Sequence, residues 1–509
     1  MIRKMLILVF AIFIFAAHST FSGTSASDTP SPMDDGTIKA LAAVAGAGTM
    51  QTHTYQYLEE LSDDIGSRVT GSPEAAKAIA WGVEKMKGIG LENVHTEAWP
   101  LSRGWTRISA NAEIISPIHR HLMIDSLGWV GSTSGGVEAD IVPVNANQLS
   151  EEMKNNAGNW RNKILLVVHR GPSSQKGLEG FVSFGNFLVA AYKAGAIAVI
   201  GGQGGSFAAG MHLTHTGVLG FDVYYDIPVV SMAAEDQKQL ERYLDRGKAI
   251  RLKMNVQNGI TNGPVESANV VGDIRGSESP EQIIVVGGHL DSWDLASGTT
   301  DNGVGTSTTL GAAEAIVKSG CKPRRTLRFV LFTGEEQGLL GSIAYVKTHQ
   351  SEMANHVAAI ILDNGQGPVV DLQLGGHDDL VPAAEQFASS LQAFGNIKAD
   401  DELEFDTDTG PFIVAGLPGI NLDQDSPDYK YTHHSSVDTF DKVQADVLDR
   451  NATIMALTAF WIANRTERLA SPWPPEKTAK MLVDRHQDTF IKAVGMWPFG
   501  NLGSEPEKK

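Results

Sequence analysis

Apolar and polar residues follow three patterns along the chain, and each predicts a different kind of structure. From about residue 34 to residue 90 the pattern is helical, with the turn-rich stretch GSRVTGSPE between two of the helices. Between about residues 115 and 258 it changes to short apolar runs and glycine-rich loops. After Asn269, apolar runs of strand length alternate regularly with amphipathic segments. A helical start, a β-rich middle unit and an α/β second half are therefore expected.

The second half predicts an α/β fold with a mostly parallel sheet and helices on both of its faces. Its expected strands are apolar throughout, which is typical of strands that are covered on both sides. The strands are expected at residues 282–288, 326–334, 356–364 and 418–425, and the helices at residues 304–320, 338–349, 380–395 and 445–466.

The first residues have the three-part pattern of a secretory signal peptide. Arg3 and Lys4 precede an apolar stretch from Met5 to about Ala17, and small residues follow as far as Ser27. The apolar stretch is shorter than the roughly 20 residues that span a bilayer, so a membrane anchor is the weaker interpretation. We therefore expect an exported protein, periplasmic or secreted, without membrane attachment after signal cleavage.

The domain boundaries follow from these changes of pattern. We expect a signal peptide at residues 1–27, the first part of the main domain at 28–114, an inserted unit at 115–258, the catalytic part of the main domain at 259–470 and a C-terminal tail at 471–509.

Composition narrows the classes of partner. The formal net charge is −18, which argues against nucleic acid and anionic membranes as partners because neither attracts an acidic surface. Cys321 is the single cysteine, so no disulfide bond can form within the chain.

Imidazole and carboxylate groups follow the ends of several expected strands. In open α/β sheets, functional groups collect beyond the carboxyl ends of the strands, so these groups are expected at one edge. Asp301 lies in the turn that starts the first helix of this half. The other candidates after strands are His289, Asp291, Glu335, Glu336, Asp363, His433 and His434.

This set of side chains is typical of a metal site. Oxygen and imidazole ligands without thiolate suit zinc, manganese or cobalt. Two histidines and three or more carboxylates, one of which bridges, fit two ions roughly 3.5–4 Å apart that activate water for hydrolysis. Each residue alone has an ordinary alternative, such as a helix cap for Asp301 or first-turn acids for Glu335 and Glu336. Their shared position at one sheet edge favours the metal site.

The motifs HLDSWD with DNGVG, TGEEQGLLGS, LDN and HHSSVDT together resemble the metallopeptidase family M28, the di-zinc aminopeptidases. HLDSWD and the ending of HHSSVDT are most similar to the carboxypeptidase Q branch of that family. The resemblance implies a zinc exopeptidase-like fold in which the inserted unit is similar to a protease-associated domain. At Asn302 the sequence departs from many relatives, which have a second aspartate there, directly after Asp301. The stretch ASGTTD also differs from the carboxypeptidase Q branch.

The resemblance also implies roles for individual residues. One of two divalent ions, zinc by expectation, would be held by His289 and Asp363, and the other by Glu336 and His434. Asp301 would bridge the two ions, and Glu335 would be the general base.

Three further residues are expected around these ligands. Asp291 is placed to accept the second N–H of His289 and orient its ring. Asp408 aligns with a pocket acid of the carboxypeptidase Q branch, with an ordinary loop acid as the alternative. His433, next to a ligand, either contributes to substrate binding or only lines the loop.

The sequence therefore predicts a two-metal exopeptidase acting on peptide substrates with a free N-terminus, as an aminopeptidase or a dipeptidase, by Glu-assisted attack of metal-activated water. Two alternatives stay open. One is a peptidase-like receptor or scaffold without activity, and the other is a single-zinc enzyme of the glutaminyl cyclase type. Assembly as a homodimer is also left open.

Overall fold

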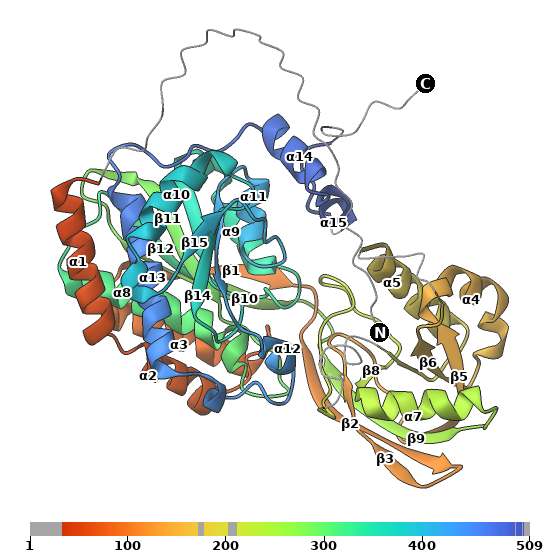
Figure 1. Ribbon diagram of the computed structural model, residues 1–509. Coiled ribbons are helices and arrows are strands. Elements are labelled where there is room, and N and C mark those ends of the chain that lie inside the picture. The colour runs from red at the N-terminus through yellow and green to blue at the C-terminus, as the bar shows by residue number, and fades with distance from the viewer. Residues whose placement is uncertain (1–32, 172–177, 202–210, 494, 501, 503–509) are drawn as a thin grey trace, which may run out of the picture. The chain divides into compact units, whose positions relative to one another are not determined.

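The computed structural model describes residues 33–171, 178–201, 211–493, 495–500 and 502 (Figure 1). The expected signal peptide at residues 1–27 and the end of the expected tail lie outside these residues. Within the described ranges, no helix is long and apolar enough to cross a membrane.

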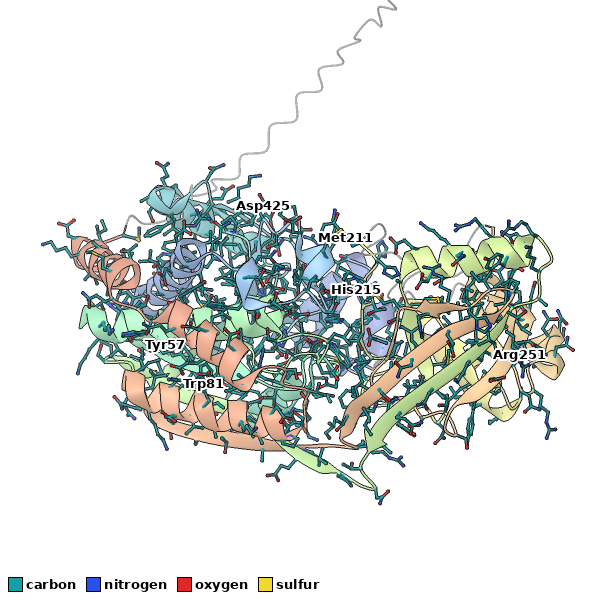
Figure 2. The ribbon with its side chains drawn as sticks, turned by 90° about the horizontal axis from the view of Figure 1, so that it is seen from below. Tyr57, Trp81, Met211, His215, Arg251 and Asp425 are labelled. Carbon is teal, nitrogen blue, oxygen red and sulfur yellow. The ribbon has the colours of Figure 1, made fainter. Side chains whose placement is uncertain are left out.

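The helices expected near the start of the chain are present. They are α1 (Asp35–Met50), α2 (Thr54–Glu59) and α3 (Pro73–Ile89), and Figure 2 marks Tyr57 of α2 and Trp81 of α3. The side chain of Ser72 accepts a hydrogen bond from the backbone N–H of Ala75 and so caps the start of α3.

The first sheet has eight strands and forms the centre of the main domain. Its order is β1 (Glu92–Leu101), β10 (Val265–Ile274), β12 (Arg325–Phe332), β11 (Ser279–His289), β13 (His356–Ile361), β16 (Gly419–Gln424), β14 (Val369–Gln373) and β15 (Lys398–Asp400). The four expected strands, β12, β11, β13 and β16, are adjacent and parallel. Strand β10 runs antiparallel to β1 and β12, and β14 runs antiparallel to β16 but parallel to β15, so the complete sheet is mixed.

Helices cover both faces of this sheet. Side chains alternate along a strand, and Phe329 and Leu331 of β12 therefore point into one apolar cluster while Val330 and Phe332 point into another. The first cluster includes residues of α1, α8 (Val304–Ser319), α10 (Val381–Ser389) and α13 (Ala445–Asn464). The second includes residues of α9 (Leu340–Thr348) and α11 (Thr409–Val414). The strands are apolar throughout because neither face meets water.

The second sheet belongs to the middle of the chain and has its own apolar clusters. Its strand order is β3 (Arg120–Leu122), β2 (Trp105–Ser116), β9 (Arg251–Ile260), β5 (Val137–Asn145), β6 (Ile164–Val168), β7 (Ala198–Ile200), β8 (Val229–Met232) and β4 (Ile124–Ser126). Helices α4 (Leu149–Asn155), α5 (Leu178–Lys193) and α7 (Ala234–Asp245) are interspersed with these strands. We call residues 105–260 the middle unit. Figure 2 marks Arg251 at the start of β9.

The tail after residue 470 contains two helices, α14 (Pro475–Asp484) and α15 (Asp488–Ala493). Leu482 of α14 and Ile491 of α15 are buried in a cluster with Phe405 and Ile413 of the main domain. This part of the tail is therefore packed against the loop and helix that precede β16.

Candidate metal centre

The candidate residues lie together at one edge of the first sheet. His289 ends β11, Glu335 and Glu336 follow β12, and Asp363 follows β13. Asp301 lies in the irregular segment η4 (Thr299–Gly303) directly before α8. His434 lies in the loop after the short helix α12 (Tyr429–Thr432), which follows β16. Carboxyl ends of parallel strands meet at one edge, and this brings residues distant in sequence into one site.

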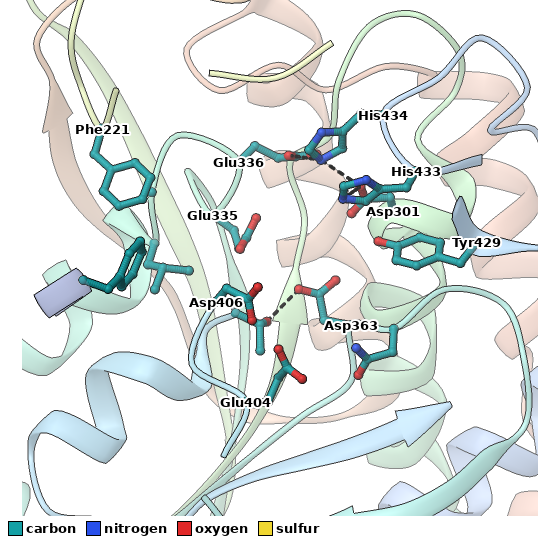
Figure 3. Close-up of a pocket in the computed structure, with 15 residues that line it drawn as sticks. Phe221, Asp301, Glu335, Glu336, Asp363, Glu404, Asp406, Tyr429, His433 and His434 are labelled. Atoms are coloured by element: carbon teal, nitrogen blue, oxygen red, sulfur yellow. Dashed lines mark hydrogen bonds and ion pairs between the residues drawn. The ribbon is translucent and has the colours of Figure 1, made fainter. Parts of the chain in front are cut away.

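The carboxylate of Asp301 lies between His289 and His434, and Figure 3 shows it beside His434. Its Oδ1 is 3.3 Å from Nε2 of His289, and its Oδ2 is 3.1 Å from Nε2 of His434. Oδ1 of Asp363 is 3.2 Å from the same nitrogen of His289, and Oε2 of Glu336 is 2.9 Å from that of His434. The site thus consists of two histidine–carboxylate pairs that share one aspartate.

These donor atoms fit divalent metal ions. With zinc–ligand distances near 2.0–2.1 Å, two donors of one tetrahedral ion lie about 3.4 Å apart. The four nitrogen–oxygen distances of the site, from 2.9 to 3.3 Å, lie slightly below that separation. Oε1 of Glu336 is also buried and has no hydrogen-bond partner among the described residues. A donor atom of Glu335 lies close enough to those of His289 and Asp363 to bind the same ion. A donor atom of His433 lies equally close to those of Asp301 and His434.

A pocket of 360 Å³ opens onto these residues, and carboxylates dominate its polar lining. Six carboxylates are among the described residues that line it, namely Asp301, Glu335, Glu336, Asp363, Glu404 and Asp406. Like charges crowded at a buried site are costly unless cations compensate them. The pocket therefore has the charge expected of a site for cations.

The pKa shifts show how strongly these groups interact. Burial raises the pKa of Glu335 well above its usual range; His289 opposes the shift, and Asp363 and Glu336 add to it. Burial likewise raises the pKa of Glu336 to about 7, with His434 opposing. For Asp301, burial also acts to raise the pKa, but hydrogen bonds from His289 and His434 lower it well below the usual range. Asp301 is therefore the carboxylate that stays charged most readily.

The ring of His289 is held by Asp291, although not through the atoms expected from the sequence. Nδ1 of His289 lies 3.0 Å from the backbone carbonyl oxygen of Asp291 and 3.6 Å from Oδ1 of its carboxylate. That carboxylate instead accepts hydrogen bonds from Oγ1 of Thr70 at 2.8 Å and from the backbone N–H of Glu335 at 3.3 Å. Asp291 thus links His289 to the loop that carries Glu335.

Other polar side chains orient the remaining carboxylates. Oγ1 of Thr407 donates to Oδ2 of Asp363 at 2.6 Å. The carboxylate of Asp438, the last acid of HHSSVDT, accepts the backbone N–H groups of Thr300 at 2.6 Å and Asp301 at 3.3 Å.

Arg68 supports the site from the stretch GSRVTGSPE, for which no residue role was predicted from the sequence. Its guanidinium is fully buried and donates at 2.7 Å to the backbone carbonyl oxygens of Gly66, Leu290, Ser297 and Gly298. Burial lowers the pKa of Arg68 to about 10, with Asp438 and Asp291 opposing. Arg68 therefore fixes both ends of the loop between His289 and Asp301.

The two expected substrate-binding residues lie in different places. His433 lines the pocket, and its ring stacks on that of His434 with centroids 3.7 Å apart. Asp408 is completely buried and is not among the residues that line the pocket. Burial raises its pKa to about 7.

Several residues that line the pocket were not among those predicted from the sequence. Glu404 and Asp406 come from the loop before α11, and Tyr429 comes from α12. Phe221 of the middle unit and Phe490 of α15 form an aromatic wall, with ring centroids 6.0 Å apart. The acidic stretch DDELEFD was a weak signal for Glu404 and Asp406, and the two phenylalanines carried none.

Comparisons with known proteins agree with this site and fold. The family model for peptidase family M28 matches residues 269–459, a range that contains all five expected ligands. Mouse carboxypeptidase Q is 31% identical to the chain over 85% of this chain and 90% of its own length. A peptidase M28 precursor from Shewanella amazonensis has a similar structure, with a TM-score of 0.75 and 27% identity over 87% of this chain and all of its own. A zinc aminopeptidase from Bacillus subtilis shares the fold at 20% identity, with a TM-score of 0.62 over 83% of this chain and 97% of its own.

The mixed α/β fold and the similarity to these relatives together identify the chain as a metallopeptidase. The chain belongs to peptidase family M28, which confirms the family expected from its motifs. Carboxypeptidase Q, which represents the expected branch of that family, is similar to the chain over most of its own length.

Replacing Arg68 with Met should destabilise the folded protein, because four carbonyl groups, two of them buried and two partly buried, would lose their charged donor. We expect the free energy of unfolding to fall by about 3 kcal/mol or more, measured by urea unfolding. The matched control is Arg170→Met, which removes an exposed ion pair with Asp245 and should change stability by less than about 1 kcal/mol. Equal losses in the two variants would contradict the supporting role of Arg68.

Proposed function

We propose that the chain is an exopeptidase that uses two divalent ions, zinc by preference, to hydrolyse peptides with a free N-terminus. The observation that carries this proposal is the carboxylate of Asp301, which lies within 3.3 Å of one histidine and 3.1 Å of the other. A carboxylate between two histidine–carboxylate pairs is the arrangement that a bridging ligand requires.

The two pairs divide the proposed ligands between the ions. His289 and Asp363 would hold one ion, Glu336 and His434 the other, and Asp301 both. Bound zinc would supply Lewis acidity, which lowers the pKa of water, polarises the scissile carbonyl and stabilises the developing oxyanion.

Glu335 is the proposed general base. It lines the pocket beside the metal ligands, and its Oε2 lies 3.9 Å from Nε2 of His289, farther than the carboxylates of either pair. A base in this position takes a proton from the attacking water and delivers it to the leaving nitrogen.

The charge of the pocket supports recognition of an ammonium group. Four of the six carboxylates, those of Asp301, Glu335, Glu336 and Asp363, balance the charge of two divalent ions. Glu404 and Asp406 remain, and burial together with Asp406 raises the pKa of Glu404 to about 9. Their carboxyl groups line the pocket together with the proposed ligands, so their oxygens can accept hydrogen bonds from the α-ammonium of a peptide.

The size of the pocket supports short substrates. Its volume is 360 Å³, near the lower end of the range for small-molecule sites, and Phe221 and Phe490 form part of its wall. Dipeptides and the ends of short peptides are the substrates that such a volume favours.

Two broader features belong to the same proposal. The basic, apolar and small-residue segments at the start of the chain support export to the periplasm or the medium. The separate sheet of the middle unit supports an insert that is similar to a protease-associated domain. The two alternatives, a scaffold without activity and a single-zinc cyclase, account less well for a complete second pair around His434 and an adjacent base.

Hydrolysis should depend on a free α-amine. We expect acetylation of the N-terminus of a dipeptide to lower kcat/KM by about 30-fold or more, because the acetylated nitrogen has no charge to pair with the carboxylates of the pocket. The measurement compares the zinc-loaded protein on a dipeptide, a longer peptide and their acetylated forms, with chelator-treated protein as the control. Equal turnover of the free and acetylated peptides would contradict the proposed recognition.

The two adjacent glutamates should differ in their effects. Glu335→Gln keeps the shape of the side chain but removes the base, so both ions should remain bound while kcat falls about 10²–10⁴-fold. Glu336→Gln, its matched control, should weaken one ion and recover part of its activity in excess zinc.

Elemental analysis and steady-state kinetics on both glutamate variants provide the measurement. Loss of an ion from Glu335→Gln, or two tightly bound ions with a pure loss of kcat in Glu336→Gln, would show that the roles are reversed.

A further inference from the structure

Arg107 of β2 joins the middle unit to the loop beside the metal centre. Its side chain is 10% exposed and forms a forked interaction with the carboxylate of Asp294, with a closest distance of 2.8 Å between Nη2 and Oδ1. The same guanidinium donates to the backbone carbonyl of Ser126 and, at 3.0 Å, to Oγ1 of Thr216. Arg107 thus connects three segments that are distant in the sequence.

Thr216 in turn contacts His434 on two sides. The backbone N–H of Thr216 donates to the carbonyl oxygen of His434 at 2.9 Å. The carbonyl oxygen of Thr216 lies 3.2 Å from Nδ1 of His434, the ring nitrogen that faces away from Asp301 and Glu336. A histidine that binds a metal through Nε2 is commonly oriented by an acceptor at Nδ1, and here a carbonyl of the middle unit occupies that position.

The neighbouring residues extend this contact into a short pairing of two chain segments. His215, marked in Figure 2, forms an isolated antiparallel bridge with Ser435. Nδ1 of His215 also lies 2.7 Å from the carbonyl oxygen of His433. The loop that carries His434 is therefore held against the middle unit by several backbone contacts.

An aromatic cluster closes the same junction from the side of Arg107. Trp105 and Trp129 of the middle unit pack against Trp293, with ring centroids 6.3 and 6.2 Å from it. The ring centroids of Trp293 and His434 lie 5.9 Å apart. The guanidinium of Arg107 lies 5.2 Å from the centroid of the Trp105 ring. These contacts restrict the space in which the loops can move.

We propose that Arg107 is a positioning residue for one half of the metal centre. By holding Thr216 in place, it keeps an acceptor at Nδ1 of His434 and so aims Nε2 at the ion shared with Glu336. The middle unit then supports the metal centre, although all five proposed ligands belong to the main domain. This inference rests on the proposed two-ion site.

The chemistry of Arg107 suits this role better than that of a lysine would. A guanidinium presents several N–H donors in a rigid plane, so it can bind a carboxylate with two atoms and still donate to two further oxygens. A lysine ammonium keeps the charge but lacks the fork. Arg107→Lys should therefore restore only part of what Arg107→Met loses.

The test measures the affinity of each ion separately, by titrating the apoprotein with zinc against a chelator of known affinity. Arg107→Met should weaken one ion by about 10–100-fold and leave the other within about threefold of wild type, because outer contacts of a ligand commonly have effects of this size. Cobalt binding provides a second measurement, since the visible spectrum of the weakened site should change. Arg170→Met, an exposed pair within the middle unit, is the control and should alter neither ion.

Thr216→Val tests whether Arg107 acts through Thr216, because it removes the hydroxyl and keeps the backbone carbonyl that faces His434. It should weaken the same ion, and the double variant with Arg107→Met should be little worse than Arg107→Met alone. Equal weakening of both ions, or unchanged affinities in Arg107→Met, would overturn the inference. Binding of fewer than two ions by the wild-type protein would instead overturn the proposed function itself.

Discussion

The shared carboxylate of Asp301 is the interaction on which the rest of the site depends. It can serve two histidines only if both approach from opposite sides, so β11 and the loop after α12 must present His289 and His434 at fixed positions. Further acids surround it, and their mutual repulsion is compensated by the histidines and, in the proposed function, by two ions. The fold has to hold this cluster of like charges in place by contacts outside it.

Those outer contacts come from parts of the chain that lie far apart. Arg68 binds the carbonyl groups at both ends of the loop between His289 and Asp301, while Thr216 of the middle unit contacts His434. Phe490 of the tail completes the pocket from a third segment. The main domain therefore supplies the charged side chains, and all three regions supply the contacts that position them or shape the space around them.

The sequence predicted those features that have a local signal. The strands β11, β12, β13 and β16 are buried on both faces, so their apolar runs are continuous, and the acids and histidines that follow them stand out. Most residues of β1 are exposed or partly buried, and β15 has three residues, so neither produced a clear run. The two edge strands of the sheet therefore went unpredicted.

Residues that act through distant contacts could not be found in the same way. Arg68 looks like part of a polar turn until its guanidinium is seen to be buried, and a backbone carbonyl such as that of Thr216 leaves no trace in the residue type. The pocket walls formed by Phe221, Glu404 and Phe490 depend on how separate segments pack. The site residues predicted from the sequence were therefore mostly candidate metal ligands, and few of the residues around those ligands were predicted.

Anomalous diffraction at the zinc absorption edge, from crystals of the zinc-loaded protein, is the most direct measurement of the shared carboxylate. We expect two peaks about 3.5–4 Å apart, one beside His289 and Asp363 and the other beside Glu336 and His434, with one oxygen of Asp301 facing each. A single peak, or two peaks of which only one contacts Asp301, would contradict a two-ion centre built on that residue.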